Sequence, residues 1–166
     1  MKRAMLLATC VAVLAVTAPA NATTGASVRG GGSGTFPATF GSIAGDRLHL
    51  EISATTLPDG TVHGTFQMLH RHLDGSTAAE MHGVVSCLSV SGTQASASGR
   101  ITGGKVTEAP AFDPAGQTFA VTIVDGAAGD AAGLDLSFFG GAHTIPPCEQ
   151  VPAYLAIDEG AFSIAA

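Results

Sequence analysis

Residues 48–71 read LHLEISATTLPDGTVHGTFQMLHR, and this stretch decides the fold. Its first part alternates apolar residues (Leu48, Leu50, Ile52) with polar ones, the period-two pattern of a strand with one buried face. Pro58-Asp59-Gly60 then provides a three-residue hairpin loop, because Pro fixes φ for a type I turn and Gly takes the left-handed position. Val62–Arg71 continues as a second strand. The stretch therefore predicts an antiparallel hairpin.

The register of this hairpin can be checked on its own side chains. With a three-residue loop, Ile52 opposes Phe66 and Leu50 opposes Met68. Both pairs place apolar groups on the same face, so the loop length and the hydrophobic pattern agree.

A second hairpin is predicted at Asp74-Gly75. With a two-residue loop, Met68 opposes Met81 and Cys87 faces the core. A three-residue loop would instead turn Glu80 and His82 toward the core, and burying an unpaired Glu80 would cost several kcal/mol. We therefore expect two-residue pairing and a polar opposite face. That face carries His49, Glu51, His63, Gln67, Arg71, Glu80 and His82.

The same alternation recurs to the end of the chain, and helical spacing is nearly absent. Further strands are predicted over residues 80–90, 94–101, 119–123, 134–139, 154–157 and 161–164. About eight or nine short strands at such intervals are typical of a small antiparallel barrel or sandwich. The predicted class is all-β, with one domain over residues 36–166.

Composition supports a folded domain. The chain has 166 residues, of which 46% are hydrophobic and 12% charged, whereas disordered chains combine low hydrophobicity with high charge. Only 7 Lys and Arg stand against 13 Asp and Glu, which gives a net charge of −6. Nucleic-acid binders need basic side chains to neutralise phosphates, so we do not expect that class of partner.

The N-terminus has the pattern of a secretory signal peptide over residues 1–22. Lys2 and Arg3 precede an uncharged apolar run, and Ala20-Asn21-Ala22 is a small-x-small cleavage site. The run is short for a membrane span, so we expect a secreted, extracellular protein with no span after cleavage. One alternative is a lipobox at Leu7-Ala8-Thr9-Cys10, which would make Cys10 a lipid-modified terminus.

Two further features follow from export. Residues 23–35 are rich in Gly, Ser and Thr, which predicts a flexible lead that contains at most a short strand at Ser27-Val28-Arg29. Two cysteines, Cys87 and Cys148, remain after cleavage, and in an oxidising compartment they most simply form one disulfide. Two free thiols or a metal pair are the alternatives.

One run is distinctive: residues 82–95 read HGVVSCLSVSGTQA. It is followed by Gly99-Arg100-Ile101-Thr102, by alternating Phe119, Val121 and Ile123, and by Pro147-Cys148. This order resembles a widespread, uncharacterised group of secreted bacterial all-β domains. The chain departs from that group at Asp125-Gly126, where the group carries Asn-Gly. The resemblance implies an exported β-domain, and no functional residue is carried over from the group.

Metal ligands were sought among the six histidines. His63 and His82 share the polar face some way apart, whereas His70 and His72 share the other face near a strand end. The predicted pairing does not bring three ligands to one point, so we expect solvated or hydrogen-bonded histidines rather than a metal site.

Calcium is a second possibility considered for the chain. Asp125, Asp130 and Asp135 lie in a Gly-rich segment that could fold around a calcium ion, which takes six to eight oxygen ligands. Asp at turn positions explains these three residues equally well, so no cofactor is expected.

No catalytic constellation is evident. The chain has no GxSxG elbow, and Asp158 and Glu159 point to opposite faces if extended. We therefore expect a non-enzymatic binding or structural module with an extracellular ligand or envelope component as partner. The first alternative is a barrel that holds a small ligand or a hydrolytic site among interior polar residues such as Glu80 and His82. The second is a calcium-binding domain.

Overall fold

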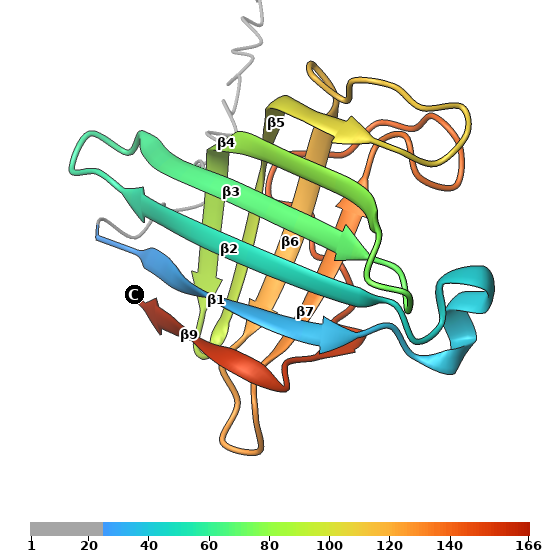
Figure 1. Ribbon diagram of the computed structural model, residues 1–166. Coiled ribbons are helices and arrows are strands. Elements are labelled where there is room, and N and C mark those ends of the chain that lie inside the picture. The colour runs from blue at the N-terminus through green and yellow to red at the C-terminus, as the bar shows by residue number, and fades with distance from the viewer. Residues whose placement is uncertain (1–24) are drawn as a thin grey trace, which may run out of the picture.

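The computed structural model describes residues 25–166, so the predicted signal peptide and Cys10 lie outside the described residues. Over the described range the chain forms nine strands and one short 3₁₀ helix (Figure 1). The elements are β1 (Ser27–Thr35), η1 (Ala38–Ile43), β2 (Arg47–Thr56), β3 (Val62–Arg71), β4 (Thr77–Ser91), β5 (Gln94–Val106), β6 (Thr118–Val124), β7 (Ala131–Leu136), β8 (Leu155–Ala156) and β9 (Glu159–Ala165). The predicted all-β class is confirmed, and no helix in this range is long and apolar enough to cross a membrane.

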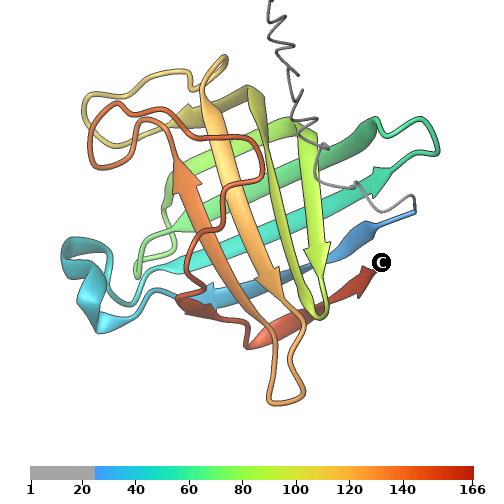
Figure 2. The same cartoon turned by 180° about the vertical axis from the view of Figure 1, so that it is seen from behind.

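All nine strands belong to one antiparallel sheet in the order β8-β7-β6-β5-β4-β3-β2-β1-β9. The sheet curls into a half-barrel, seen from both sides in Figures 1 and 2. Its two edges meet through the last segment of the chain, because β8 pairs with β7 and the following β9 pairs with β1. Between them, Ile157 N–H donates to the Asp130 carbonyl and Asp158 N–H donates to the Ser33 carbonyl, each at 2.9 Å.

The hairpin predicted over residues 48–71 is confirmed with its register. Ile52 pairs with Phe66 and Leu50 with Met68, and Leu57 N–H donates to the Thr61 carbonyl at the loop. The inner face of this hairpin, meaning the face toward the core, is therefore apolar.

The second hairpin differs from the prediction in its loop. His72 N–H donates to the Ser76 carbonyl, so the loop has three residues, 73–75, rather than two. A β-bulge between His70 and Arg71 restores the phase, and Met68 still pairs with Met81. Glu80 therefore points outward despite the longer loop, because a bulge adds one residue to a single strand.

The prediction of a flexible lead over residues 23–35 is wrong for most of its length, because Ser27–Thr35 forms β1 between β2 and β9. A Cβ on Gly30 would overlap the Ala161 carbonyl oxygen, and one on Gly34 would overlap the Ala156 carbonyl oxygen. The glycines of β1 therefore allow the backbone of residues 156–161 to pack closely against this strand, and they do not make it flexible.

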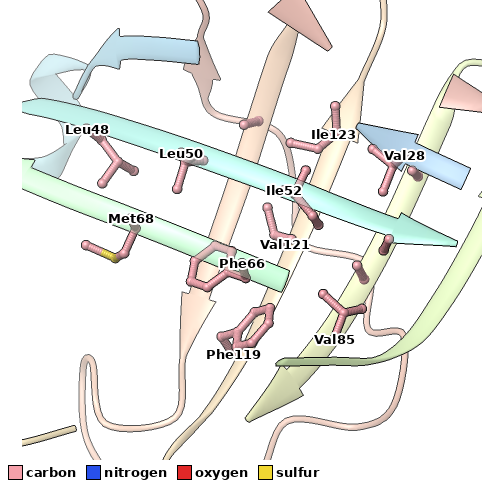
Figure 3. Close-up of a cluster of buried hydrophobic side chains, with 14 of the residues drawn as sticks. Val28, Leu48, Leu50, Ile52, Phe66, Met68, Val85, Phe119, Val121 and Ile123 are labelled. Carbon is pink, nitrogen blue, oxygen red and sulfur yellow. The ribbon is translucent and has the colours of Figure 1, made fainter. Parts of the chain in front are cut away.

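The interior of the half-barrel is filled with apolar side chains. Figure 3 shows Val28, Leu48, Leu50, Ile52, Phe66, Met68, Val85, Phe119, Val121 and Ile123. Phe66 of β3 stacks on Phe119 of β6 with ring centroids 4.1 Å apart, so the two walls of the sheet touch across the core.

The disulfide between Cys87 and Cys148 is confirmed, and it joins positions 61 residues apart. Closing a loop of that length stabilises the fold by roughly 4 kcal/mol in the chain-entropy account. The predicted facing of Cys87 is wrong: a bulge between Val85 and Cys87 pairs Cys87 with Ser98, while the next residue, Leu88, is buried in the core. Because neighbouring side chains alternate, Cys87 lies on the outer face.

The segment after β7 lies against the outside of the sheet (Figure 2), and the disulfide to Cys87 ties it there. Cys148 N–H donates to Ser98 Oγ at 2.8 Å, and Val151 N–H donates to Thr122 Oγ1 at 2.9 Å. Ser98 and Thr122 are buried in consequence. This half of the outer face is covered, whereas the half over β2, β3 and β4 carries exposed polar side chains.

Candidate functional site

An apolar pocket of about 130 Å³ opens at the end of the half-barrel where β3 ends and β2 begins, beside η1 (Figure 1). Three aromatic side chains form one wall: the Phe40 ring lies 4.5 Å from Tyr154 and 5.3 Å from Phe36, centroid to centroid. Met68 and Met81 also line the pocket. The pocket is a local gap in a core that is otherwise closed by packing.

Tyr154 is held rigidly in this wall. Its hydroxyl donates to the Leu134 carbonyl at 3.0 Å and accepts from Leu134 N–H at 3.3 Å. Burial raises the pKa of Tyr154 to about 12, so the phenol is neutral at physiological pH. The ring therefore offers the pocket an apolar face, with its polar atom already satisfied.

Three polar residues gather beside the pocket, which His70 lines, and we call Asp46, His70 and His72 the Asp46 cluster. Asp46 precedes β2 and is only 4% exposed. Its Oδ2 lies 2.9 Å from His70 Nε2 and 3.0 Å from His72 Nδ1. Its Oδ1 accepts from Leu73 N–H at 3.2 Å. The register of β2 with β3 and the three-residue loop after β3 bring these groups together.

The carboxylate of Asp46 is ionised despite its burial. Burial alone would raise the pKa of Asp46, but the hydrogen bonds and charges of His70 and His72 outweigh that effect and leave the pKa below its ordinary value. An ionised carboxylate can only accept, so each ring turns an N–H toward it. The cluster thus carries a buried negative charge that two imidazoles compensate.

Glu108 lies next to this cluster on the solvent side. Its Oε1 is 3.4 Å from His72 Nε2, the ring nitrogen that does not face Asp46. Glu108 and His70 are the polar residues that line the apolar pocket. The pocket therefore has an apolar interior and an acidic, imidazole-bearing rim.

No local pattern in the sequence singles out Asp46. The confirmed pairing ends at Arg47 with Arg71, and one further step in the same register sets Asp46 opposite His72. Continuing the predicted hairpin register beyond the apolar pairs would therefore have found this contact.

The polar residues predicted for one face do lie together on the outer face. Glu51 of β2 pairs with Gln67 of β3, which pairs with His82 of β4, and we call these three the outer row. All three are exposed, as are Glu80 and His63. With His49 and Glu80 the outer row borders a shallow, open hollow. His63 pairs with Thr55 near the opposite end of β3 from His70.

This placement overturns the alternative of a polar interior with Glu80 and His82. Both side chains point away from the core, because the bulge beside His70 keeps them in phase with Gln67 and Leu69. The interior positions of the same strands are apolar.

The three aspartates considered for calcium do not come together. Asp130 Oδ2 accepts from Phe162 N–H at 2.7 Å, and Asp135 Oδ2 lies 2.9 Å from His143 Nε2. Asp125 directly follows β6. Within residues 25–166, the group of three or more potential metal ligands with atoms inside 4.8 Å of one another is the Asp46 cluster.

Comparison of the chain with protein-family models, with curated proteins and with solved structures finds no match. The candidate site therefore stands on its own geometry. It combines an apolar pocket, a rigid aromatic wall and, behind His70, a buried carboxylate that two histidines contact.

Proposed function

We propose that this chain is a secreted, disulfide-stapled binding domain that takes the apolar part of a small molecule into the pocket at the end of the half-barrel. The observation that carries the proposal is the pocket itself, with an apolar interior and few polar groups at one rim. Small-molecule sites have this composition, with a few polar groups that fix orientation. Export is supported by the N-terminal pattern, and paired cysteines are typical of oxidising compartments.

The volume limits the occupant. About 130 Å³ is close to the roughly 150 Å³ dry cavity that accepts benzene in another protein. A single aromatic ring or a short branched acyl group fits this space. Because the rim carries Glu108, the polar end of the ligand is a cation or hydrogen-bond donor. An exposed pair of this kind contributes at most about 1 kcal/mol, so the preference is modest.

The test is a methyl NMR titration of the protein labelled at methionine, with toluene, benzylamine and benzoate as probes. We expect toluene and benzylamine to shift the methyl signals of Met68 and Met81, with benzoate binding a few-fold more weakly than benzylamine. Unshifted signals at saturating concentrations of all three probes would contradict the proposal.

A pair of matched variants locates the binding. Ala79→Leu adds three carbons at the pocket wall, and Ala161→Leu adds the same group at an exposed position of β9. The first variant should weaken benzylamine binding about tenfold by filling the space, and the second should leave it unchanged. Equal affinity in both would place the probe elsewhere.

A further inference from the structure

We propose that Asp46, His70 and His72 bind a divalent transition-metal ion, with zinc as the reference ion. Two imidazoles and one carboxylate form a ligand set that suits zinc and its neighbours, whereas calcium and magnesium prefer oxygen ligands only. Such a site is separate from the apolar pocket, although His70 contributes to both.

The distances between the candidate ligand atoms already approach those of a metal site. Tetrahedral zinc with bonds of about 2.0–2.1 Å places its ligand atoms about 3.3 Å apart. Asp46 Oδ2 lies 2.9 Å from His70 Nε2 and 3.0 Å from His72 Nδ1. The three ligand atoms lie within 4.8 Å of one another. An ion therefore needs only a small outward movement of the two rings.

The carboxylate is held in place by the backbone. Leu73 N–H donates to Oδ1, which leaves Oδ2 directed at the two rings. The Asp46 backbone is fixed at both ends, because its N–H donates to the Ile43 carbonyl and its carbonyl accepts from Phe36 N–H. His72 N–H donates to the Ser76 carbonyl. Ligands held before binding lose little conformational freedom, which favours affinity.

The surroundings of His72 provide independent support. A histidine that binds a metal through one nitrogen usually donates its other N–H to a carboxylate or carbonyl. His72 turns Nδ1 toward the cluster, and its Nε2 lies 3.4 Å from Glu108 Oε1. When the ion takes Nδ1, the ring proton moves to Nε2 and faces Glu108. The ring thus presents Nδ1 to the ion while its other nitrogen faces a carboxylate.

The remaining coordination position is open to water. The His72 side chain is 35% exposed, whereas that of His70 is 12% exposed. Three protein ligands with one solvent-accessible position is the arrangement of an exchangeable zinc site rather than a closed structural one. The alternative role of the cluster is purely structural, with Asp46 tying the β3–β4 loop to the start of β2.

Calorimetric titration separates the two roles. The folded protein, first dialysed against EDTA, is titrated with zinc chloride and, in parallel, with calcium chloride. We expect one zinc ion per chain with a Kd in roughly the micromolar range or tighter, and no calcium binding at the same concentrations. Absence of zinc binding would overturn the proposal and leave the structural role.

Variants assign the ion to the cluster. His72→Ala removes the more exposed ligand and should weaken zinc binding about tenfold or more, and Glu108→Gln should weaken it by up to a similar factor. The matched control is His82→Ala in the outer row, which should bind zinc as the unaltered protein does. Circular dichroism confirms that each variant is folded. Zinc binding that survives His72→Ala, or that is lost in His82→Ala, would overturn the assignment.

Discussion

Strand β3 carries two histidines, His63 and His70, and their surroundings differ completely. The two positions differ by an odd number of steps along the strand, so the side chains project to opposite faces of the sheet. His63 is exposed on the outer face, whereas His70 lies against a buried carboxylate beside the apolar pocket. One histidine of the strand is therefore exposed to solvent, whereas the other belongs to the candidate site.

The outer row and the Asp46 cluster extend this comparison to neighbouring strands. Glu51, Gln67 and His82 form a straight ladder across three strands, each side chain open to water. In the cluster, the ends of β2 and β3 and the loop after β3 bring three groups to one point, with a carboxylate that is 4% exposed. Charges in water interact weakly, while buried ones interact strongly. Both groups contain acidic residues and histidine, so it is their position on the sheet that makes one of them a candidate site.

The largest effect is expected from removing the buried acceptor. Asp46→Ala leaves three donors without their partner, the rings of His70 and His72 and the N–H of Leu73. We expect a loss of about 2–4 kcal/mol in the free energy of unfolding, measured with urea. Glu51→Ala in the outer row is the control and should change it by less than about 0.5 kcal/mol. Equal losses would remove the distinction between the two regions.

A second prediction concerns Tyr154, the only tyrosine of the chain. The pKa of Tyr154 is about 12 in the folded protein, above the unfolded value of about 10. The unfolded chain therefore loses this proton first, so stability is complete below pH 10 and falls as the pH rises toward 12. The full loss of about 2–3 kcal/mol is reached above pH 12, and about half of it should be present at pH 11.

Urea unfolding at pH 9, 10 and 11 checks this dependence. At pH 9, Tyr154→Phe should be less stable than the unaltered protein, because it lacks the two hydrogen bonds to Leu134. Between pH 9 and 11, its free energy of unfolding should fall less, because it has no phenol to ionise. The same decline in both proteins would mean that Tyr154 is not buried as described.

In the metal-free protein, the contribution of Asp46 to the free energy of unfolding should depend on pH in the acid range. Because the pKa of Asp46 is lowered in the folded state, its contribution is present above the unfolded value of about 3.9 and is lost as the pH falls through the folded value. Asp46→Asn should therefore show a shallower fall in stability below pH 4, measured by urea unfolding in EDTA. The turn residues Asp59 and Asp74, whose pKa values are also lowered by hydrogen bonds from Thr61 and Ser76, contribute equally to both proteins. Parallel curves would contradict the assignment.

The smallest effect is expected in the outer row. Gln67→Ala and His82→Ala remove exposed side chains without leaving a buried group unsatisfied, so each should change the unfolding free energy by less than about 0.5 kcal/mol. A loss of more than about 1 kcal/mol in either variant would mean that the row is not simply solvated.

Much of the fold could be predicted because it rests on local signals. The alternation in residues 48–71 and the Pro58-Asp59-Gly60 loop correctly gave the hairpin and its register, and the strand pattern gave the all-β class. Cys87 and Cys148 pair as predicted.

The errors lie where contacts between distant segments override local signals. The glycines of β1 suggest flexibility until β9 is placed against them. Two bulges, beside His70 and before Cys87, each change the pairing register by one residue. The alternation of residues within one strand does not show where such a bulge lies. The Asp46 cluster needs the buried Asp46 beyond the end of the predicted β2 pairing, and the pocket needs Tyr154 to meet Phe36 and Phe40 from the other end of the chain.

The most direct measurement is diffraction from crystals grown with zinc, with data collected on both sides of the zinc absorption edge. An anomalous peak bonded to His70 Nε2, His72 Nδ1 and Asp46 would place the metal where the two imidazoles meet the buried carboxylate, as proposed. A peak at His49, Glu51 or His82 on the outer face, with the Asp46 cluster still held by its hydrogen bonds alone, would contradict it.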